Sequence, residues 1–314
     1  MPNIKPVICG VCGKSANLNF KEDFKEYSLW ECPECFGQFW SPMKGPGAGW
    51  YEKDERYSFR NLNPLEKPER NHREFLRDLP AKGGRLLDIG MGTGNFLAAA
   101  VKSGYDGYGV DFDSEAIETA KRVFGLKNVS TGDLDGVLKD FGEKSFDIVT
   151  MFEVVEHLEN PAEFIEKSKR LLKNGGYLAI SVPFRGAAEF LKPNDKPPRH
   201  LTRWDKNSME NFLKEHEFET ARIKIIKAPI SYLITKFHFW TRGFLSFNAV
   251  GKLSAVPAGQ KAVNNKVSLR ARVIQKMARI KDYILFLLPA IILSGILLVT
   301  GRNGLGLYIL AKKK

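Results

Sequence analysis

Three glycines at alternate positions, Gly90, Gly92 and Gly94, follow a short apolar stretch that carries an acid, Asp88. Glycine lets a backbone turn tightly and approach a ligand with no Cβ in the way. The dinucleotide-binding fingerprint is spaced Gly-x-Gly-x-x-Gly and directs a helix N-terminus at a pyrophosphate. Here the third glycine comes one residue early and a carboxylate precedes the loop. The pattern predicts a loop that meets a cationic ligand without a phosphate.

A second acid, Asp111, ends the next expected strand, 17 residues after Gly94. A carboxylate at the tip of the second strand of such a sheet is suited to binding a ribose diol. The glycine loop and Asp111 together therefore predict a nucleoside-containing ligand.

All four cysteines lie in the first 35 residues as two pairs, Cys9-x-x-Cys12 and Cys32-x-x-Cys35. Two such pairs can place four thiolates tetrahedrally around one zinc ion, and a closed four-cysteine shell is structural rather than catalytic. The alternatives are two disulfides or a redox pair. Because no N-terminal signal is visible, we expect an intracellular chain, in which disulfides are disfavoured. We expect a zinc ribbon.

Residues 85–183 resemble a class I S-adenosylmethionine (SAM)-dependent methyltransferase. Besides the glycine loop and Asp111, the resemblance rests on Thr-Gly-Asp-Leu at 131–134, Phe-Asp-Ile-Val-Thr-Met-Phe-Glu-Val-Val-Glu-His at 146–157 and the fifth-strand segment 175–183. It implies a SAM site made of Asp88, Gly90, Gly92, Gly94, Asp111, Phe112, Asp133, Leu134 and Phe152. Asp133 would contact the adenine, and Phe152 would lie beside the sulfur. Small polysaccharide- and lipid-modifying methyltransferases of this class often carry an N-terminal zinc ribbon.

The reaction that this resemblance implies is an in-line displacement, in which most of the catalysis comes from positioning the acceptor. A hydroxyl acceptor also needs a base, for which His157 and His200 are the candidates. Glu153, Glu156 and His157, with His200, resemble the set that binds magnesium in small-RNA 2′-O-methyltransferases, and ubiquinone-biosynthesis O-methyltransferases have a similar Glu-Val-Val-Glu-His stretch. The alternative to a Mg²⁺ site is that these side chains brace a loop through hydrogen bonds.

The order of apolar and amphipathic segments predicts an α/β fold with a doubly wound, seven-stranded, Rossmann-like sheet. Helices are expected at 114–124, capped by Ser114, and at 161–173, capped by Asn160. The expected organisation is a zinc ribbon (1–40), a connector (41–70), the SAM-binding core (71–228), a basic and apolar insertion (229–304) and a final antiparallel strand of the core sheet (305–314).

Charge is distributed unevenly along the chain. From Ala221 onward, 17 Lys and Arg face one acid, Asp282, a net charge of +16, which leaves −4 for the preceding residues out of the total of +12. Such asymmetry indicates an anionic partner for the last third of the chain: a membrane surface, a nucleic acid or a phosphorylated substrate.

The insertion combines aromatic residues at 230–250, a basic amphipathic segment at 267–281 and 18 uncharged residues at 283–300. This length is near the minimum for a membrane-spanning helix, but Pro289 interrupts it and the final strand must return to the sheet. We therefore expect an in-plane or re-entrant hairpin on the cytoplasmic leaflet. A buried helical lid or a dimer contact is the alternative.

Two functions compete. The first is O-methylation of a membrane-associated acceptor, either a small molecule such as a quinone-like ring or a lipid-linked glycan, by a cytoplasmic enzyme attached peripherally or monotopically to the membrane. The second is RNA methylation, in which the ribbon and the basic last third bind nucleic acid. A catalytically silent binding module is disfavoured because the cofactor motifs are intact. The sequence favours the first function.

Overall fold

The chain divides into two units. The computed structural model of the protein describes residues 7–47, 55–191, 195–249 and 269–314. Unit 1 comprises Met1–Gly186, Lys192–Ile226 and Leu305–Lys314, and unit 2 comprises Ala187–Leu191 and Lys227–Gly304.

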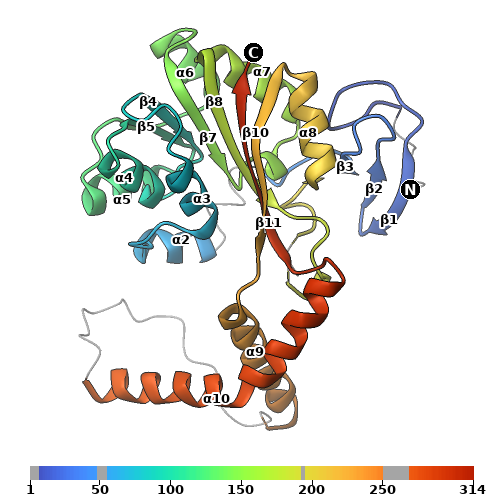
Figure 1. Ribbon diagram of the computed structural model, residues 1–314, viewed down its shortest axis with the longest axis vertical. Helices are drawn as coiled ribbons and strands as arrows, with labels where there is room; N and C mark the ends of the chain where they lie inside the picture. The colour runs from blue at the N-terminus through green and yellow to red at the C-terminus, as the bar shows by residue number, and fades with distance from the viewer. Residues whose placement is uncertain (1–6, 48–54, 192–194, 250–268) are drawn as a thin grey trace. The chain divides into compact units, whose positions relative to one another are not determined.

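A seven-stranded sheet of order β10-β11-β8-β7-β4-β5-β6 forms the centre of unit 1 (Figure 1). The strands β4 to β8 form parallel pairs with one another, whereas β11 runs antiparallel to β8. Their bounds are β4 Arg85–Ile89, β5 Asp106–Asp111, β6 Val129–Thr131, β7 Phe146–Phe152, β8 Leu172–Pro183, β10 Phe218–Lys227 and β11 Gly304–Lys313. The expected doubly wound sheet with an antiparallel last strand is confirmed.

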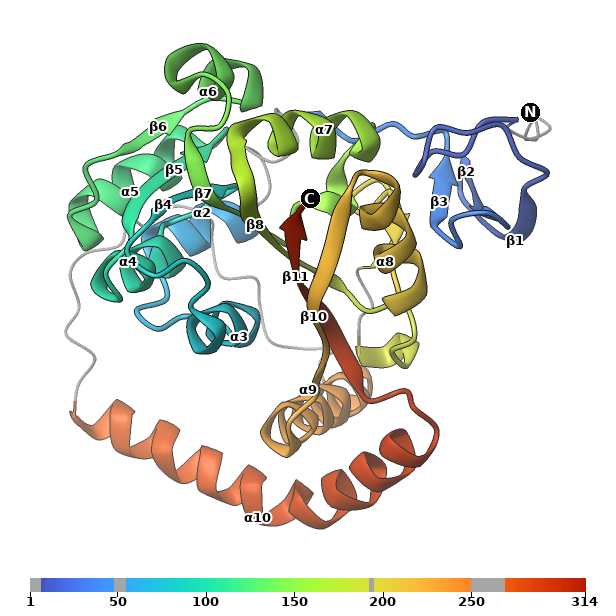
Figure 2. The same ribbon diagram turned by 45° about the horizontal axis from the view of Figure 1, so that its top comes forward.

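Helices cover both faces of this sheet (Figure 2). Successive residues of β4 point to opposite faces, so Leu86 and Leu87 belong to different buried clusters. The Leu86 cluster includes Phe75 of α3, Phe96 of α4 and Ile117 of α5, and the Leu87 cluster includes Val137 of α6, Ile165 of α7 and Phe212 of α8. The bounds are α2 Glu55–Leu62, α3 Arg70–Asp78, α4 Asn95–Lys102, α5 Ser114–Phe124, α6 Leu134–Phe141, α7 Pro161–Leu171 and α8 Lys206–Glu215.

One helix cap and one helix end differ from the sequence-based expectation, whereas the expected bounds of the helix at 114–124 are confirmed. The N-cap of α5 is Asp113, not Ser114: its Oδ1 atom accepts the amides of Glu115 (3.0 Å) and Ala116 (3.2 Å). A carboxylate one residue earlier satisfies two orphan amides of the first turn, so the expected cap becomes the first helical residue. Helix α7 has the expected cap, Asn160, but ends at Leu171 because β8 begins directly afterward.

A separate four-stranded sheet of order β1-β2-β3-β9 lies in the N-terminal part of unit 1. Three strands come from the first 41 residues: β1 Asn19–Phe24, β2 Tyr27–Glu31 and β3 Gln38–Ser41. The fourth, β9 Thr202–Arg203, comes from the segment after β8 and pairs antiparallel with β3. This pairing was not predicted from the sequence.

Unit 2 contains two long helices, α9 Ile230–Ala249 and α10 Leu269–Val299, and the short η2 Glu189–Leu191. The rings of Phe237 and Phe286 stack with centroids 6.1 Å apart, so the two helices pack together. Pro289 lies inside α10 instead of ending it, and α10 changes direction along its length (Figures 1 and 2), as a helix with an internal proline does. The predicted basic and apolar segments thus share one helix. The side chains of the amphipathic segment predicted at 267–281 lie outside those that the structure describes.

Within the described residues, no helix combines the length and the apolar character that crossing a membrane requires.

Candidate active site

The glycine loop turns directly from β4 into α4. Gly90, Gly92 and Gly94 have φ values of +68°, +53° and +82°, in the left-handed region that side chains rarely adopt. A Cβ on Gly90 would lie 2.6 Å from Val154 Cγ2, so this position also requires a close approach of two loops. Gly94 is the N-cap of α4. The loop therefore needs glycine for its own geometry.

Asp111, at the end of β5, is tied to the glycine loop. Its Oδ2 atom accepts the amide of Gly92 at 2.7 Å, and Oδ1 accepts the amide of Asp113 at 2.9 Å. Burial raises the pKa of Asp111, while these two amides and the nearby Arg60 act in the opposite direction. Each carboxylate oxygen has a further acceptor site for a ligand hydroxyl. The side chain is thus oriented before any ligand binds.

Asp88 is fully buried at the end of β4. Its Oδ1 atom accepts the hydroxyl of Thr150 at 2.7 Å, and burial raises the pKa of Asp88 to about 8. A cationic group bound beside this carboxyl would favour its ionised form.

Two adjoining cavities lie at the carboxyl ends of the central strands, where open α/β sheets bind ligands. The larger has a volume of about 330 Å³ and includes Gly90, Asp111, Phe112, Asp133, Leu134 and His157 in its lining. The smaller has a volume of about 180 Å³ and includes Asp88, Gly90, Gly92, Phe152 and His157. Asp133 also caps α6 by accepting the amide of Gly136 at 2.9 Å. Gly90, Glu153, His157 and Arg60 line both cavities.

His157 and His200 lie together beside the smaller cavity, their ring centroids 4.8 Å apart. His157 Nδ1 is 2.7 Å from the carbonyl oxygen of Arg199, and His200 Nδ1 is 2.8 Å from Asp195 Oδ1. A carbonyl or carboxylate oxygen only accepts, so Nδ1 of each ring carries the proton and donates. In the neutral rings, Nε2 is therefore the acceptor nitrogen. Burial and the neighbouring His200 lower the pKa of His157 to about 3.

Glu156 joins these histidines, whereas Glu153 does not. One ligand atom from each of Glu156, His157 and His200 lies within 4.8 Å of the others, and Glu156 is buried in the short 3-10 turn η1, Val155–His157. Glu153 adopts a positive φ of 57° and accepts the hydroxyl of Ser181 on β8 at 3.0 Å. The expected four-residue set thus forms as a cluster of three.

Several residues of the smaller cavity were not predicted from the sequence. They lie before the glycine strand or in the loop after β8: Arg60, Glu69, Asn71, His72 and Arg199. His72 is buried against Phe96 and Phe152, with ring centroids 5.1 and 5.0 Å apart, and burial lowers its pKa to about 3. Asn71 and His72 are buried polar residues on α3, the helix that precedes the glycine strand β4. Polar residues on the inward face of that helix are the signal that could have indicated these two.

The four cysteines form a compact cluster of free thiols. Their sulfur atoms all lie within 4.8 Å of one another, and Cys9 Sγ and Cys35 Sγ are 3.8 Å apart. Zinc–sulfur bonds of about 2.3 Å in a tetrahedron place neighbouring sulfurs about 3.8 Å apart. The amides of Val11 and Gly37 point at Cys9 Sγ (3.3 Å) and Cys35 Sγ (3.4 Å). The donor set therefore fits one zinc ion.

Comparison with known proteins decides the family. Residues 60–222 match the family model described as a methyltransferase domain. The chain belongs to this family. The matched range contains every lining residue of both cavities and every residue of the expected SAM site.

Curated relatives of this methyltransferase include ubiquinone biosynthesis O-methyltransferases. The one from Paracidovorax citrulli is 31% identical over 120 residues, covering 36% of this chain and 49% of the relative. The one from Methylococcus capsulatus is 29% identical over 147 residues, covering 45% and 60%. The chain thus spans about half to three fifths of the length of the curated relatives it matches.

Solved structures agree in fold. A SAM-dependent methyltransferase from Archaeoglobus fulgidus is 21% identical, with a TM-score of 0.50, over 83% of this chain and 100% of that one. Phosphoethanolamine N-methyltransferase 2 from Haemonchus contortus, solved with SAM, is 19% identical with a TM-score of 0.50, over 84% and 57%. The expectation of a class I SAM-dependent methyltransferase with a Rossmann-like sheet is confirmed.

Proposed function

We propose that this methyltransferase transfers a methyl group from SAM to an oxygen atom of a small-molecule acceptor that is lipid-linked or quinone-like. The curated relatives named as O-methyltransferases support oxygen as the acceptor atom. The observation that carries the proposal is that His157 lines both of the cavities that SAM would occupy, so that its imidazole lies beside the methyl donor.

The larger cavity suits the nucleoside part of SAM. Asp111 would accept the ribose hydroxyls, Asp133 and Leu134 would contact the adenine, and Phe112 would cover its exposed side. In the smaller cavity, Asp88 offers a carboxyl to the cationic end, and Gly92 and Phe152 form the wall. SAM, when bound, supplies an electrophilic methyl group.

On the acceptor side, His157 would take the proton from the hydroxyl. Its Nδ1 atom is held by the Arg199 carbonyl, which leaves Nε2 as the acceptor nitrogen. A proton transfer of this kind contributes about 10²- to 10⁴-fold to a rate. We assign His200 and Glu156 the role of supporting this proton transfer.

As the alternative to proton transfer by His157, we propose that Glu156, His157 and His200 bind a divalent cation, in which case His157 Nε2 would coordinate the ion and not take the proton. One ligand atom from each of the three residues lies within 4.8 Å of the others, which is close enough for a common ion. Metal-binding imidazoles usually donate their other ring N–H to an oxygen atom, as both Nδ1 atoms do here. Such an ion would orient a hydroxyl and lower its pKa. Two imidazoles suit Mn²⁺, Fe²⁺ or Zn²⁺ better than the Mg²⁺ considered from sequence.

The cysteine cluster is proposed to hold one structural zinc ion. Its support is the 3.8 Å sulfur spacing and the two amides directed at sulfur. Elemental analysis of the purified chain should find one zinc per chain in this site, and Cys32→Ser should remove it.

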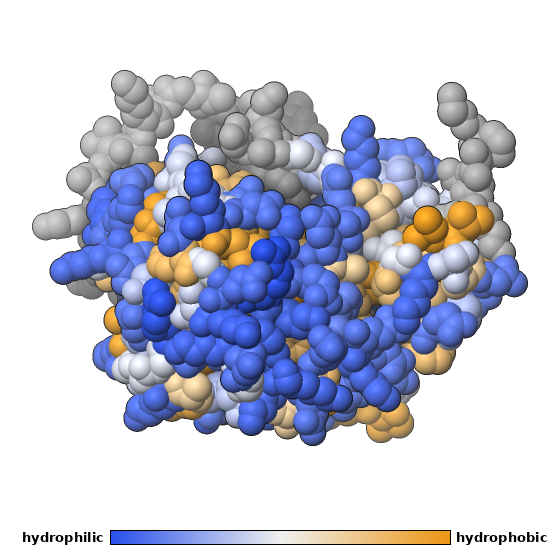
Figure 3. Space-filling view, turned by 90° about the horizontal axis from the view of Figure 1, so that it is seen from above, coloured by the Kyte–Doolittle hydropathy of each residue, from blue (hydrophilic) through white to orange (hydrophobic). Residues whose placement is uncertain are grey.

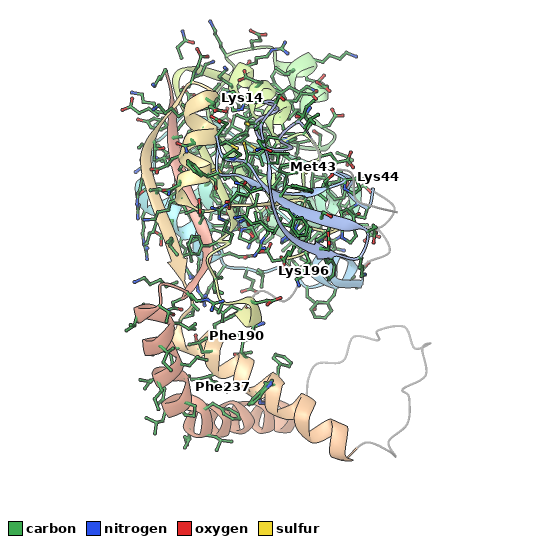
Figure 4. All side chains as sticks on the ribbon, turned by 90° about the vertical axis from the view of Figure 1, so that its right-hand side faces the viewer. Lys14, Met43, Lys44, Phe190, Lys196 and Phe237 are labelled. Carbon is green, nitrogen blue, oxygen red and sulfur yellow. The ribbon has the colours of Figure 1, made fainter. Side chains whose placement is uncertain are left out.

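Unit 2 is proposed to attach the enzyme peripherally to an anionic membrane surface, in keeping with the expected insertion at 229–304. Its aromatic residues Trp240 and Phe239 are 71% and 68% exposed, and Ile284 of α10 is 77% exposed. Phe239 and Trp240 line an apolar cavity of about 510 Å³ together with Phe190 and Phe237 (Figure 4). By contrast, the face seen in Figure 3 is mostly hydrophilic. Exposed apolar surface beside basic sequence is typical of monotopic membrane binding.

Vesicle flotation tests this attachment. The chain should float with vesicles that contain phosphatidylglycerol, and a Phe239→Ser/Trp240→Ser double variant should lose most of this binding. A Val101→Ser variant, which changes an exposed apolar residue of unit 1, is the matched control. Equal binding of all three proteins would contradict the proposal.

Methyl transfer itself is tested with isotope-labelled SAM and separate lipid-extract and RNA fractions. We expect label in a lipid-extractable product, and His157→Gln should reduce the rate about 10²- to 10⁴-fold. Label in RNA alone would replace this proposal with the RNA alternative.

A further inference from the structure

The zinc ribbon and the candidate active site share a strand. Within the ribbon sheet, Gln38 pairs with Arg203 and Phe39 with Thr202. The amide of Trp40 also donates to the carbonyl of Leu201 at 2.8 Å. The segment 199–203, which carries His200, is thereby joined to the ribbon sheet through its last three residues.

The opposite side of the same segment is bound to the turn that carries His157. The amide of Leu201 donates to the carbonyl of Glu156 at 2.7 Å. The hydroxyl of Thr202 donates to the carbonyl of Val155 at 3.3 Å, and His157 Nδ1 donates to the carbonyl of Arg199 at 2.7 Å. Segment 199–203 therefore lies between the ribbon and the η1 turn, with hydrogen bonds to both.

A second link joins the core to the cysteine knuckle. Arg185, just after β8, donates from Nη1 to the carbonyl of Phe36 at 2.6 Å. Phe36 lies between Cys35 and Gly37, whose amide points at the Cys35 sulfur. The same guanidinium pairs with Asp205 and lies 3.8 Å from Glu31. Arg185 thus connects the cysteine knuckle at Phe36 with Glu31 at the end of β2 and with Asp205, which follows β9.

We infer that the ribbon positions the segment 199–203, which we call the acceptor-side segment. A metal ion on the four cysteines holds Arg199 and His200 of this segment against His157. The inference rests on the proposed zinc ion and on the proposed role of His157. A four-cysteine zinc site supplies much of the folding free energy of a small ribbon. Loss of the metal therefore loosens β3 and its partner strand β9. The cavity that contains Asp111 and Asp133 is built by other strands, so we expect it to keep its structure.

Hydrogen exchange on the full chain, with and without metal removal by a chelator, tests this coupling. We expect the amides of 199–203 to lose protection by about tenfold or more together with those of β3. Amides of β7 and the dissociation constant for SAM should change little. Elemental analysis of the same samples confirms whether the zinc has left.

Arg185→Ala provides a test that leaves all four cysteines in place. We expect partial loss of protection at 199–203 and a fall in kcat with an unchanged dissociation constant for SAM, and Arg185→Lys should restore part of both. The matched control is Lys14→Ala, which removes a solvent-exposed ion pair of 2.8 Å between the ribbon and Glu215 of α8, a kind of contact with little effect on stability.

Two results would overturn the inference. One is full protection of 199–203 in a chain shown to have lost its zinc. The other is an identical effect of Arg185→Ala and Lys14→Ala. A chain that keeps the exchange coupling but never transfers a methyl group would instead contradict the proposed function, so the two failures are distinguishable.

Discussion

At the scale of single residues, hydrogen bonds to Nδ1 set the chemistry of the site's three imidazoles. His157 and His200 donate from Nδ1 to oxygen atoms, whereas His72 Nδ1 accepts the amide of Glu69 at 3.2 Å. In the neutral rings, Nε2 is then an acceptor in His157 and His200 but a donor in His72. The site thus has acceptor nitrogens on His157 and His200 and a donor nitrogen on His72 of α3.

The buried His72 should make stability depend on pH. Burial lowers its pKa to about 3 in the folded chain, whereas an unfolded histidine titrates near 6.5. Between these values the unfolded chain binds more protons, so stability falls as the pH drops from about 6.5 toward 3, by up to about 1.4 kcal/mol per pH unit. Denaturant titrations of the wild type and His72→Phe at several pH values should give a shallower slope for the variant. Equal slopes would contradict the assignment.

Gly90→Ala separates backbone strain from close packing. Its added Cβ would lie 2.6 Å from Val154 Cγ2 at a φ of +68°. Gly125 has nearly the same φ, +66°, but open space around it, so Gly125→Ala is the matched control. We expect the control to cost about 1 kcal/mol and Gly90→Ala clearly more, together with weaker SAM binding. Thermal unfolding and calorimetry measure both effects, and equal costs would show that the contact with Val154 is unimportant.

At the scale of elements, the capping residue decides where a helix begins. Asp113 caps α5 and also accepts the side-chain amide of Asn61 at 2.8 Å, which links α5 to α2. Since α2 carries Arg60 of both cavities, this cap contributes to the site as well as to the helix.

Asp113→Ala should lower the free energy of unfolding by about 1 to 2 kcal/mol. Ser114→Ala, one residue later, should change it by less than about 0.5 kcal/mol because Ser114 is not the cap. Urea titrations of both variants provide the measurement. A larger effect of Ser114→Ala would restore the cap assigned from sequence.

Features set by neighbours in sequence could be predicted, and those set by distant pairing could not. The glycine loop, Asp111 and the last strand follow from local spacing, and the structure has them where expected. The pairing of β9 with β3 joins residues more than 160 positions apart, and no local pattern in 199–204 marks a strand. His72 was missed because its role arises only when α3 packs beside Phe152. Helix α10 continues through Pro289 although that residue suggested a break.

At the scale of the whole molecule, unit 2 leaves and re-enters unit 1 at adjacent points. The amide of Ala228 donates to the carbonyl of Asn303 at 2.8 Å. The strand that follows, β11, then pairs with β8 in the core sheet. A long insertion between neighbouring ends of this kind costs the core little.

Replacing residues 229–302 with a short glycine-serine linker should therefore leave unit 1 folded and able to bind SAM, but unable to float with anionic vesicles. A chain that ends at Asn303 is the contrasting variant: it lacks β11 and should not fold, because β11 lies between β8 and β10. Circular dichroism, calorimetry and flotation follow these properties. Loss of folding in the linker variant would contradict the division into units.

Calorimetric titration of the purified chain with SAM, alongside NAD, tests the central claim most directly. We predict saturable binding of SAM, little binding of NAD, and at least about tenfold weaker SAM binding in Asp111→Ala, since each bond to a carboxylate contributes about 1.5 to 3 kcal/mol. The variant Asp106→Ala, at the exposed start of the same strand, should bind SAM as the wild type does. A chain that takes up NAD and ignores SAM would contradict the account.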